Sequence, residues 1–189
     1  MRRGTAERET AEVEVKVDMN LDLPGYEIET GIPFFNHMLE SFAKHSGIGL
    51  DLSAKGDIEV DEHHTVEDTA ITMGRALKEA LGDKKGIRRF GDAIIPMDES
   101  IAICAVDISG RGVLNYEGEL GNIDGFKGDN FYHFFDTLCR YSGLNVYLSV
   151  KGKNSHHMME AGFKAFGVAL KKAVQIIDDE VKSTKGELD

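Results

Sequence analysis

The stretch HHTVEDTAITMGRALK, residues 63–78, recurs in altered form as HHMMEAGFKAFGVALK, residues 156–171. Both copies begin with the pattern His-His-x-x-Glu, which ends at Glu67 in the first and at Glu160 in the second. Successive residues of a helix are about 100° apart, so the two adjacent histidines diverge and the glutamate lies between them. Because diverging histidines are poorly placed to bind one ion, the pattern predicts two metal ions, each receiving one histidine from each copy.

A further histidine precedes each cluster, His37 before the first and His133 before the second, so six of the seven histidines belong to the doubled pattern. The predicted metal ligands are His37, His63, His64, Glu67, His133, His156, His157 and Glu160. Imidazole and carboxylate ligands around a six-coordinate ion favour Mn²⁺, with Fe²⁺, Co²⁺ or Zn²⁺ as substitutes. The alternative is a structural ion, or histidines that are merely packed in the core.

The duplication extends well beyond the histidines. Adding 96 to a residue number pairs His37 with His133 and Lys44 with Arg140, and adding 93 pairs the two metal clusters. Two copies are too few for a solenoid. We therefore expect two halves, 1–86 and 87–189, packed about a pseudo-twofold axis and sharing a metal pair. Each half is predicted to be strand-strand-helix-strand-helix, an α+β fold with helices packed on antiparallel sheets.

Local patterns place the expected elements along the chain. Alternating polar and apolar residues predict strands, and Pro, Gly and Asp mark the ends of helices. In the first half we expect strands at 9–19, 26–30, 48–54 and 58–60, and helices at 33–45 and from a cap at Asp61 to 81. In the second half we expect strands at 101–108, 112–119 and 144–150, a helix capped by Asp129 or Asn130, and a last helix at 156–181.

Composition restricts the class of protein. The length of 189 residues suits one domain or two half-domains that share a core. A net charge of −11 argues against a nucleic-acid backbone as a partner. No apolar run is long enough to span a membrane, and the N-terminus lacks a signal-peptide pattern. Cys104 and Cys139 stand outside any paired motif, so we expect reduced thiols in a cytoplasmic protein.

Several basic and acidic residues are candidates for contacts with a substrate. Arg89, Arg111, Lys164, Ser183 and Lys185 are suited to bind a phosphate. Lys164 follows Glu160 by four residues and therefore shares its helix face. Glu9, Asp98, Glu99 and Asp107 are candidate acid–base groups. The alternative for each residue is a solvated surface charge.

At these residues the chain resembles the imidazoleglycerol-phosphate dehydratases. The resemblance covers nearly the whole chain, with motifs in the family order. The matching stretches are 8–10 (RET), 31–39 (GIPFFNHML), 61–68 (DEHHTVED), 86–91 (GIRRFG), 96–99 (PMDE), 107–111 (DISGR), 152–157 (GKNSHH), 160–165 (EAGFKA) and 183–186 (STKG). The chain departs from the family pattern at Asn36, where Asp is usual, at Tyr147, where His is common, at Gly112, where Pro is common, and at Leu23-Pro24.

The resemblance implies a Mn²⁺-dependent dehydration of D-erythro-imidazole-glycerol phosphate to imidazole-acetol phosphate, with two Mn²⁺ per chain. It implies that Glu9, Asp98 or Glu99 removes the carbon-bound proton, with Glu9 preferred. It implies that Arg89, Arg111, Lys164, Ser183 and Lys185 bind the phosphorylated imidazole substrate. It further implies a homo-oligomer of 24 subunits with sites at subunit boundaries, and none of the departures removes a predicted metal ligand.

Two other classes of protein compete with this interpretation. A dinuclear metallohydrolase would act on an ester or amide, and would need a carboxylate that bridges the two ions. A metal-storage or structural assembly protein would bind metal but would have no use for the basic residues. Formation of the ketone product from imidazole-glycerol phosphate distinguishes the dehydratase from both.

Overall fold

The order of secondary-structure elements repeats once along the chain. A computed structural model describes residues 1–123, 125–184 and 188. The first half contains β1 (Arg3–Glu9), β2 (Val13–Asn20), β3 (Tyr26–Glu29), α1 (Pro33–Ser46), β4 (Gly49–Gly56) and α2 (His63–Leu81). The second contains β5 (Phe90–Met97), β6 (Ser100–Asp107), β7 (Val113–Glu117), α3 (Gly128–Ser142), β8 (Asn145–Lys151) and α4 (Ser155–Ala173).

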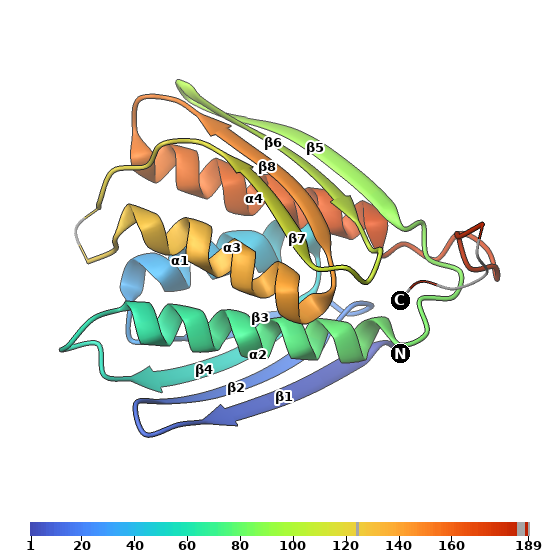
Figure 1. The fold of residues 1–189 in the computed structure, drawn as a ribbon, viewed down its shortest axis with the longest axis horizontal. Helices are drawn as coiled ribbons and strands as arrows, with labels where there is room; N and C mark the ends of the chain where they lie inside the picture. Colours follow the sequence, from blue (N-terminus) through green and yellow to red (C-terminus); the bar gives the residue numbers. More distant parts are fainter. Residues whose placement is uncertain (124, 185–187, 189) are drawn as a thin grey trace.

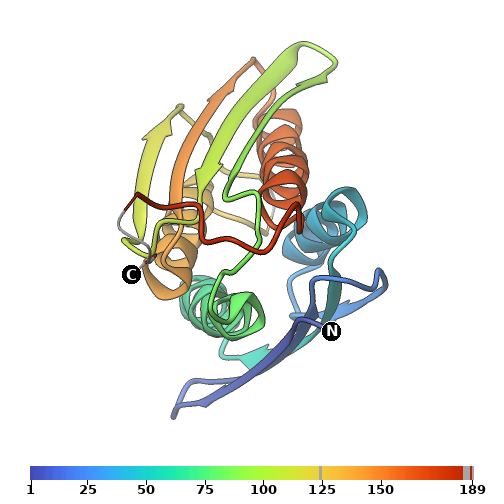
Figure 2. The same cartoon turned by 90° about the vertical axis from the view of Figure 1, so that its right-hand side faces the viewer.

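Each half forms a four-stranded sheet, and the four helices lie between the two sheets (Figures 1 and 2). The strand orders are β1-β2-β4-β3 and β5-β6-β8-β7. The helices join the halves, because α1 packs on α4 of the second half and α2 packs on α3. The N-terminus lies at the same end of the molecule as the C-terminal end of α4 (Figure 1).

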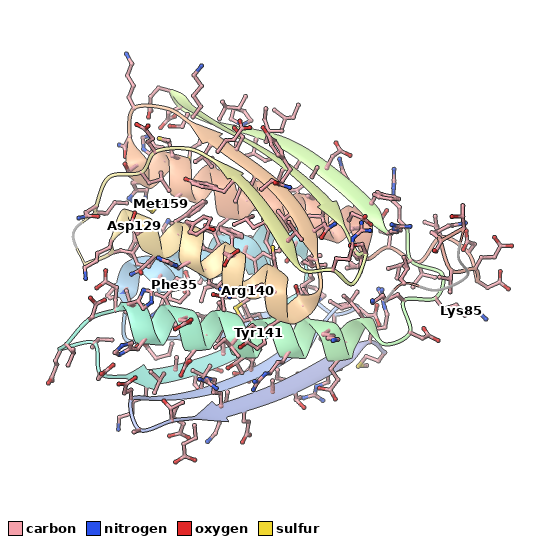
Figure 3. All side chains as sticks on the ribbon, viewed as in Figure 1. Phe35, Lys85, Asp129, Arg140, Tyr141 and Met159 are labelled. Carbon is pink, nitrogen blue, oxygen red and sulfur yellow. The ribbon has the colours of Figure 1, made fainter. Side chains whose placement is uncertain are left out.

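The core forms where the inward faces of the sheets meet the helices. Strand β2 buries Val13, Val15 and Val17 and alternates them with exposed or half-exposed polar residues, as a strand with one covered face should. Phe35 of α1 and Met159 of α4 are fully buried between the layers (Figure 3). The predicted α+β class and the repeated halves are therefore confirmed.

The first strand of each half approaches its helix at a glycine. A Cβ on Gly4 of β1 would collide with the carbonyl oxygen of Ala76 in α2, and a Cβ on Gly91 of β5 would collide with that of Ala169 in α4. Only glycine permits this contact, since any side chain would force strand and helix apart. The pairs obey the duplication, because Ala76 and Ala169 differ by 93 in residue number.

The expected strands differ from the observed ones in three respects. Each half begins with a strand outside the expected set. Residues 9–19 are not one strand, since β1 ends at Glu9 and β2 begins at Val13, and β5 precedes the strand expected at 101–108. Strand β1 was missed because its inward side chains are small or charged, and β5 because it is apolar on both faces. Residues 58–60 form turns rather than a strand. The sheets are mixed rather than antiparallel, because β3 and β7 run parallel to β4 and β8.

The helix boundaries need two corrections. Helix α3 begins at Gly128 without a side-chain cap, so neither Asp129 nor Asn130 caps it. Helix α4 ends at Ala173, not at Val181, because the following residues bind the linker: Arg88 donates to the carbonyl of Gln175, and Ile177 donates to that of Gly86. Asp61 does act as expected, since its carboxylate accepts a hydrogen bond from the backbone N–H of His63.

Within the residues that the structure describes, no helix combines the length and the apolar character needed to cross a membrane. The exact division of the halves at residue 86 stays a prediction.

Candidate metal centre and substrate site

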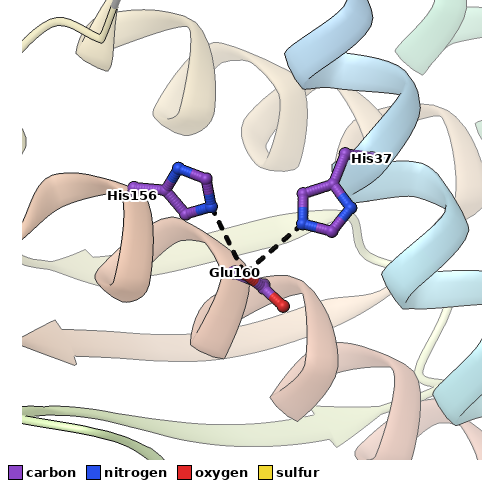
Figure 4. A group of neighbouring side chains, drawn as sticks. All are labelled: His37, His156 and Glu160. Carbon is purple, nitrogen blue, oxygen red and sulfur yellow. Dashed lines mark ion pairs between the residues drawn. The ribbon is translucent and has the colours of Figure 1, made fainter.

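The upstream histidine of one half meets the His-His-x-x-Glu cluster of the other. His37 on α1 and His156 on α4 each place Nε2 3.4 Å from Oε2 of Glu160 (Figure 4). Burial opposes ionisation of Glu160, but a hydrogen bond from Lys164 and its positive charge outweigh burial and lower the pKa of the carboxyl. These three side chains form the first half-site, with ligand atoms close enough to hold one metal ion.

The second half-site lies where α2 meets α3. The rings of His63 and His133 are 5.0 Å apart, and Nδ1 of His63 lies 3.2 Å from Oδ1 of the buried Asn130. Glu67, one turn along α2, is half-buried and forms no ion pair among the described residues. His133 therefore lies beside His63 in the same way that His37 lies beside His156, as the duplication leads us to expect.

The second histidine of each cluster points elsewhere, toward carboxylates of its own half. His64 lies 3.3 Å from Asp57 and 3.5 Å from Glu12, and His157 lies 2.9 Å from Glu99 and 3.7 Å from Asp98. The hydrogen bond to Asp57 raises the pKa of His64, and that to Glu99 raises the pKa of His157. The eight predicted ligands therefore do not converge on a pair of sites within the chain.

Two carboxylates in these outer clusters, Glu12 and Asp57, were not singled out from the sequence. Glu12 could have been suspected, since it lies 87 positions before Glu99, as Val13 of β2 lies 87 before Ser100 of β6. Glu99 is strongly held by His157. The hydrogen bond from His157, with further bonds from the backbone of Glu99 and from Ser100, lowers the pKa of Glu99 to about 2.

The predicted phosphate-binding residues separate into two places. Nε of Arg89 lies 2.7 Å from Asp107, and Nη1 of the same guanidinium donates to the carbonyl of Lys182, next to Ser183. Arg111 is exposed and lies 4.0 Å from Asp107. Lys164 is instead on α4, with Nζ 2.7 Å from Glu160. Lys185 lies outside the described residues.

Among the candidate bases, Glu9 and Asp107 do not contact a histidine within the described residues, and Glu9 is the one that is also free of an arginine. It is exposed at the end of β1, on the outer face of its sheet beside Lys16. Asp98 and Glu99 both lie beside His157. Asp107 is held by Arg89, which makes it a structural partner of that guanidinium.

Three of the four departures from the family pattern have local explanations. The side-chain oxygen of Asn36 accepts hydrogen bonds from the N–H and hydroxyl of Thr30, so it fixes the entry to α1 rather than orienting His37. Tyr147 lies on the outer face of its sheet and donates to Glu117. Gly112 has a φ of 67°, which proline cannot adopt.

The half-sites suit a divalent ion in their donor set. Imidazole nitrogen with carboxylate oxygen fits Mn²⁺ and its neighbours in the first transition series. The contact from Asn130 leaves Nε2 of His63 as the ring's lone-pair donor, an arrangement usual for metal-binding histidines.

Comparisons with known proteins agree over the whole chain. The family model described as imidazoleglycerol-phosphate dehydratase matches residues 30–170. The imidazoleglycerol-phosphate dehydratase of Archaeoglobus fulgidus is 53% identical over 182 residues, which cover 96% of this chain and 97% of that protein. That of Methanosphaerula palustris is 47% identical over 195 residues, covering 100% of both.

Solved structures show the same fold. The crystal structure of imidazoleglycerol-phosphate dehydratase from Staphylococcus aureus matches with a TM-score of 0.84 at 35% identity, covering 93% of this chain and 99% of that one. The crystal structure of IGPD from Pyrococcus furiosus matches with a TM-score of 0.85 at 34% identity, covering 96% and 99%.

Proposed function

Because the chain belongs to the imidazoleglycerol-phosphate dehydratase family and is a hydro-lyase of histidine biosynthesis, we propose that its reaction depends on Mn²⁺, with two ions per chain. The observation that carries the proposal is the pair of half-sites, His37–His156–Glu160 and His63–His133 with Glu67 nearby. Family membership removes the hydrolase and storage alternatives.

The difficulty of the reaction explains why such a site is needed. The proton to be lost is bound to carbon, and hydroxide is a poor leaving group. When bound, the ions would stabilise the anionic form of the substrate imidazole, which makes the ring an electron sink. The histidines and glutamates of the half-sites would hold these ions. We assign proton removal to Glu9, because its exposed carboxylate is not engaged by any histidine, whereas Glu99 is.

The substrate, D-erythro-imidazole-glycerol phosphate, also carries an anion that the basic residues would bind. Arg89 lies at the C-terminal end of α4, because its backbone N–H donates to the carbonyl of Ala173. Arg111 and Ser183 lie close to it, through Asp107 and the carbonyl of Lys182 respectively. The half-sites lie instead at the N-terminal ends of α2 and α4. Helix α4 has 19 residues and is therefore about 28 Å long. One chain cannot bring both groups to one small substrate, so the phosphate would be bound partly by a second copy.

This separation supports a homo-oligomer with sites at subunit boundaries, for which we propose the 24 subunits typical of the family. The outward His64 and His157 would then complete half-sites of neighbouring copies. We also propose a cytoplasmic location, because Cys104 and Cys139 are buried free thiols. No role for nucleic acid or membrane enters the proposal.

Metal-stripped protein tests the central claim. Incubation with the substrate should yield imidazole-acetol phosphate only after Mn²⁺ is restored, and elemental analysis of the desalted protein should approach two ions per chain. Full turnover in the presence of excess chelator, from protein shown to be free of metal, would contradict it.

A further inference from the structure

The two half-sites are related by the duplication but differ in what surrounds them. Asn130 of α3 and Phe34 of α1 occupy equivalent positions, each three residues before the upstream histidine, and their numbers differ by 96. Lys164 and Ile71 are also equivalent, each four residues after the glutamate of its cluster. Both differences fall on residues that touch or adjoin the metal ligands.

Asn130 acts on His63 through a hydrogen bond. Its amide oxygen lies 3.2 Å from Nδ1 of His63, and the side chain is only 2% exposed. An amide oxygen can only accept, so this contact keeps the proton on Nδ1 and leaves the Nε2 lone pair for a metal ion. A partner of this kind also fixes the orientation of the ring and raises its basicity. The amide nitrogen of Asn130 has no partner within the described residues, so the hydrogen bond to His63 is the main polar contact of this side chain.

Phe34 offers His156 no such partner. Its ring meets the imidazole edge-on, with centroids 5.1 Å apart, and it packs also on Phe126. Among the described residues, no side chain accepts a hydrogen bond from Nδ1 of His156, so neither the tautomer nor the basicity of that ring is set in this way.

The glutamates of the two half-sites also differ in the charge beside them. Nζ of Lys164 lies 2.7 Å from Oε1 of Glu160, whose side chain is 9% exposed. The ammonium group therefore already occupies one oxygen of this ligand, and its positive charge repels a divalent ion. In the other half-site the equivalent position holds the buried, uncharged Ile71. Glu67 therefore lacks a competing ammonium one turn away.

We propose that the half-sites have unequal metal affinities, with the His63–His133 half-site the tighter, and that Asn130 is the positioning residue chiefly responsible. This inference rests on the metal dependence proposed above. The protein should consequently load its ions in two steps rather than one.

Binding of Mn²⁺ to the metal-stripped full-length protein tests this directly, with free Mn²⁺ followed by its electron paramagnetic resonance signal. The wild type should show two classes of sites at least about tenfold apart in Kd. Asn130→Ala should weaken only the tighter class, by about 10- to 100-fold, the usual effect of losing the partner of a metal-binding histidine.

Two further variants separate positioning from a general structural effect. Asn130→Asp retains an oxygen that can only accept, and loses no hydrogen bond of the amide nitrogen, so it should restore or exceed the wild-type affinity of the tighter class. Phe34→Leu, the matched change in the other half, should leave that class unchanged. Asn130→Asp also keeps the test valid if Asn130→Ala does not fold.

The outcomes distinguish this inference from the proposal beneath it. A single class of wild-type sites would overturn the inference while leaving metal dependence intact. So would an Asn130→Ala variant that binds as the wild type does, or one in which both classes weaken equally. Failure of the wild type to bind Mn²⁺ at all would overturn the proposed metal dependence itself, and with it the inference.

Discussion

The outer faces of the two sheets differ sharply although the strands beneath them correspond. On the β1–β4 sheet, strand β2 presents Glu14, Lys16 and Asp18, and an offset of 87 replaces them on β6 by Ile101, Ile103 and Ala105. The same change recurs on the neighbouring strands. Arg3, Glu7 and Asp51 correspond to Phe90, Ile94 and Tyr147.

Because one outer face is charged and the other largely apolar on the same strand framework, the fold requires only the inward face of each sheet to be apolar. The charged face shows that the outward positions tolerate charge, so the apolar residues of the second sheet do not serve the folding of one chain. Ile94 is 64% exposed and Phe90 53%, and Ile94 pairs with Ile103 of β6, so exposed apolar side chains adjoin one another on this face. Such surfaces mark sites of association, which agrees with the proposed assembly of copies.

The largest expected effect concerns the hairpins that join the first two strands of each half. Glu9, the last residue of β1, corresponds to Pro96 of β5, so only the first half carries a carboxylate at this position, while Asp98 and Glu99 follow at the tip of the second hairpin. Glu9→Gln should reduce kcat by about 10²- to 10⁴-fold, the usual contribution of a general base, while the bound Mn²⁺ is retained. Steady-state kinetics with elemental analysis measure both. Turnover within a few-fold of the wild type would transfer the role to Glu99 or Asp98.

The outer faces predict a smaller effect, on assembly. Ile103→Asp places an unpaired charge on the apolar face and should weaken association of copies by about 1.5–3 kcal/mol per contact, the value of burying one such side chain. Sedimentation velocity should show smaller particles. The equivalent change on the charged face, Lys16→Asp, should leave the particle mass unaltered. Identical masses for both variants would show that the apolar face is not an interface.

The smallest predicted effect concerns pH. Burial, with the nearby charge of Lys164, lowers the pKa of His45, whose equivalent in the second half is Tyr141. The unfolded chain protonates His45 near its ordinary pKa of about 6.5, before the folded chain does, so acidification through that range favours unfolding. The melting temperature of the His45→Tyr variant should therefore fall slightly less than that of the wild type between pH 7 and pH 5. An equal loss in both proteins, by scanning fluorimetry, would show that His45 does not contribute.

Most of the fold could be predicted because the duplication and the burial pattern are periodic in sequence. The strands at β2, β4, β6 and β8 alternate plainly, and the helices that carry the His-His-x-x-Glu clusters begin where expected. Strand β1 escaped prediction because its inward side chains are small or charged, and β5 because apolar residues lie on both of its faces, so neither strand shows an apolar period. The end of α4 escaped because the competing partner, the linker near Gly86, is far away in sequence.

The sequence by itself determined the identity of the metal-ligand candidates, their doubling and the divergence of adjacent histidines, because helix periodicity places neighbouring side chains without reference to the rest of the chain. Only the tertiary structure decided which ligands meet. It pairs His37 with His156 and His133 with His63 across the halves, and directs His64 and His157 to Glu12, Asp57 and Glu99. It also placed Asn130 against His63 but Phe34 against His156. Such contacts depend on how α1 packs on α4 and α3 on α2, and this packing joins residues about a hundred positions apart, which no local pattern records.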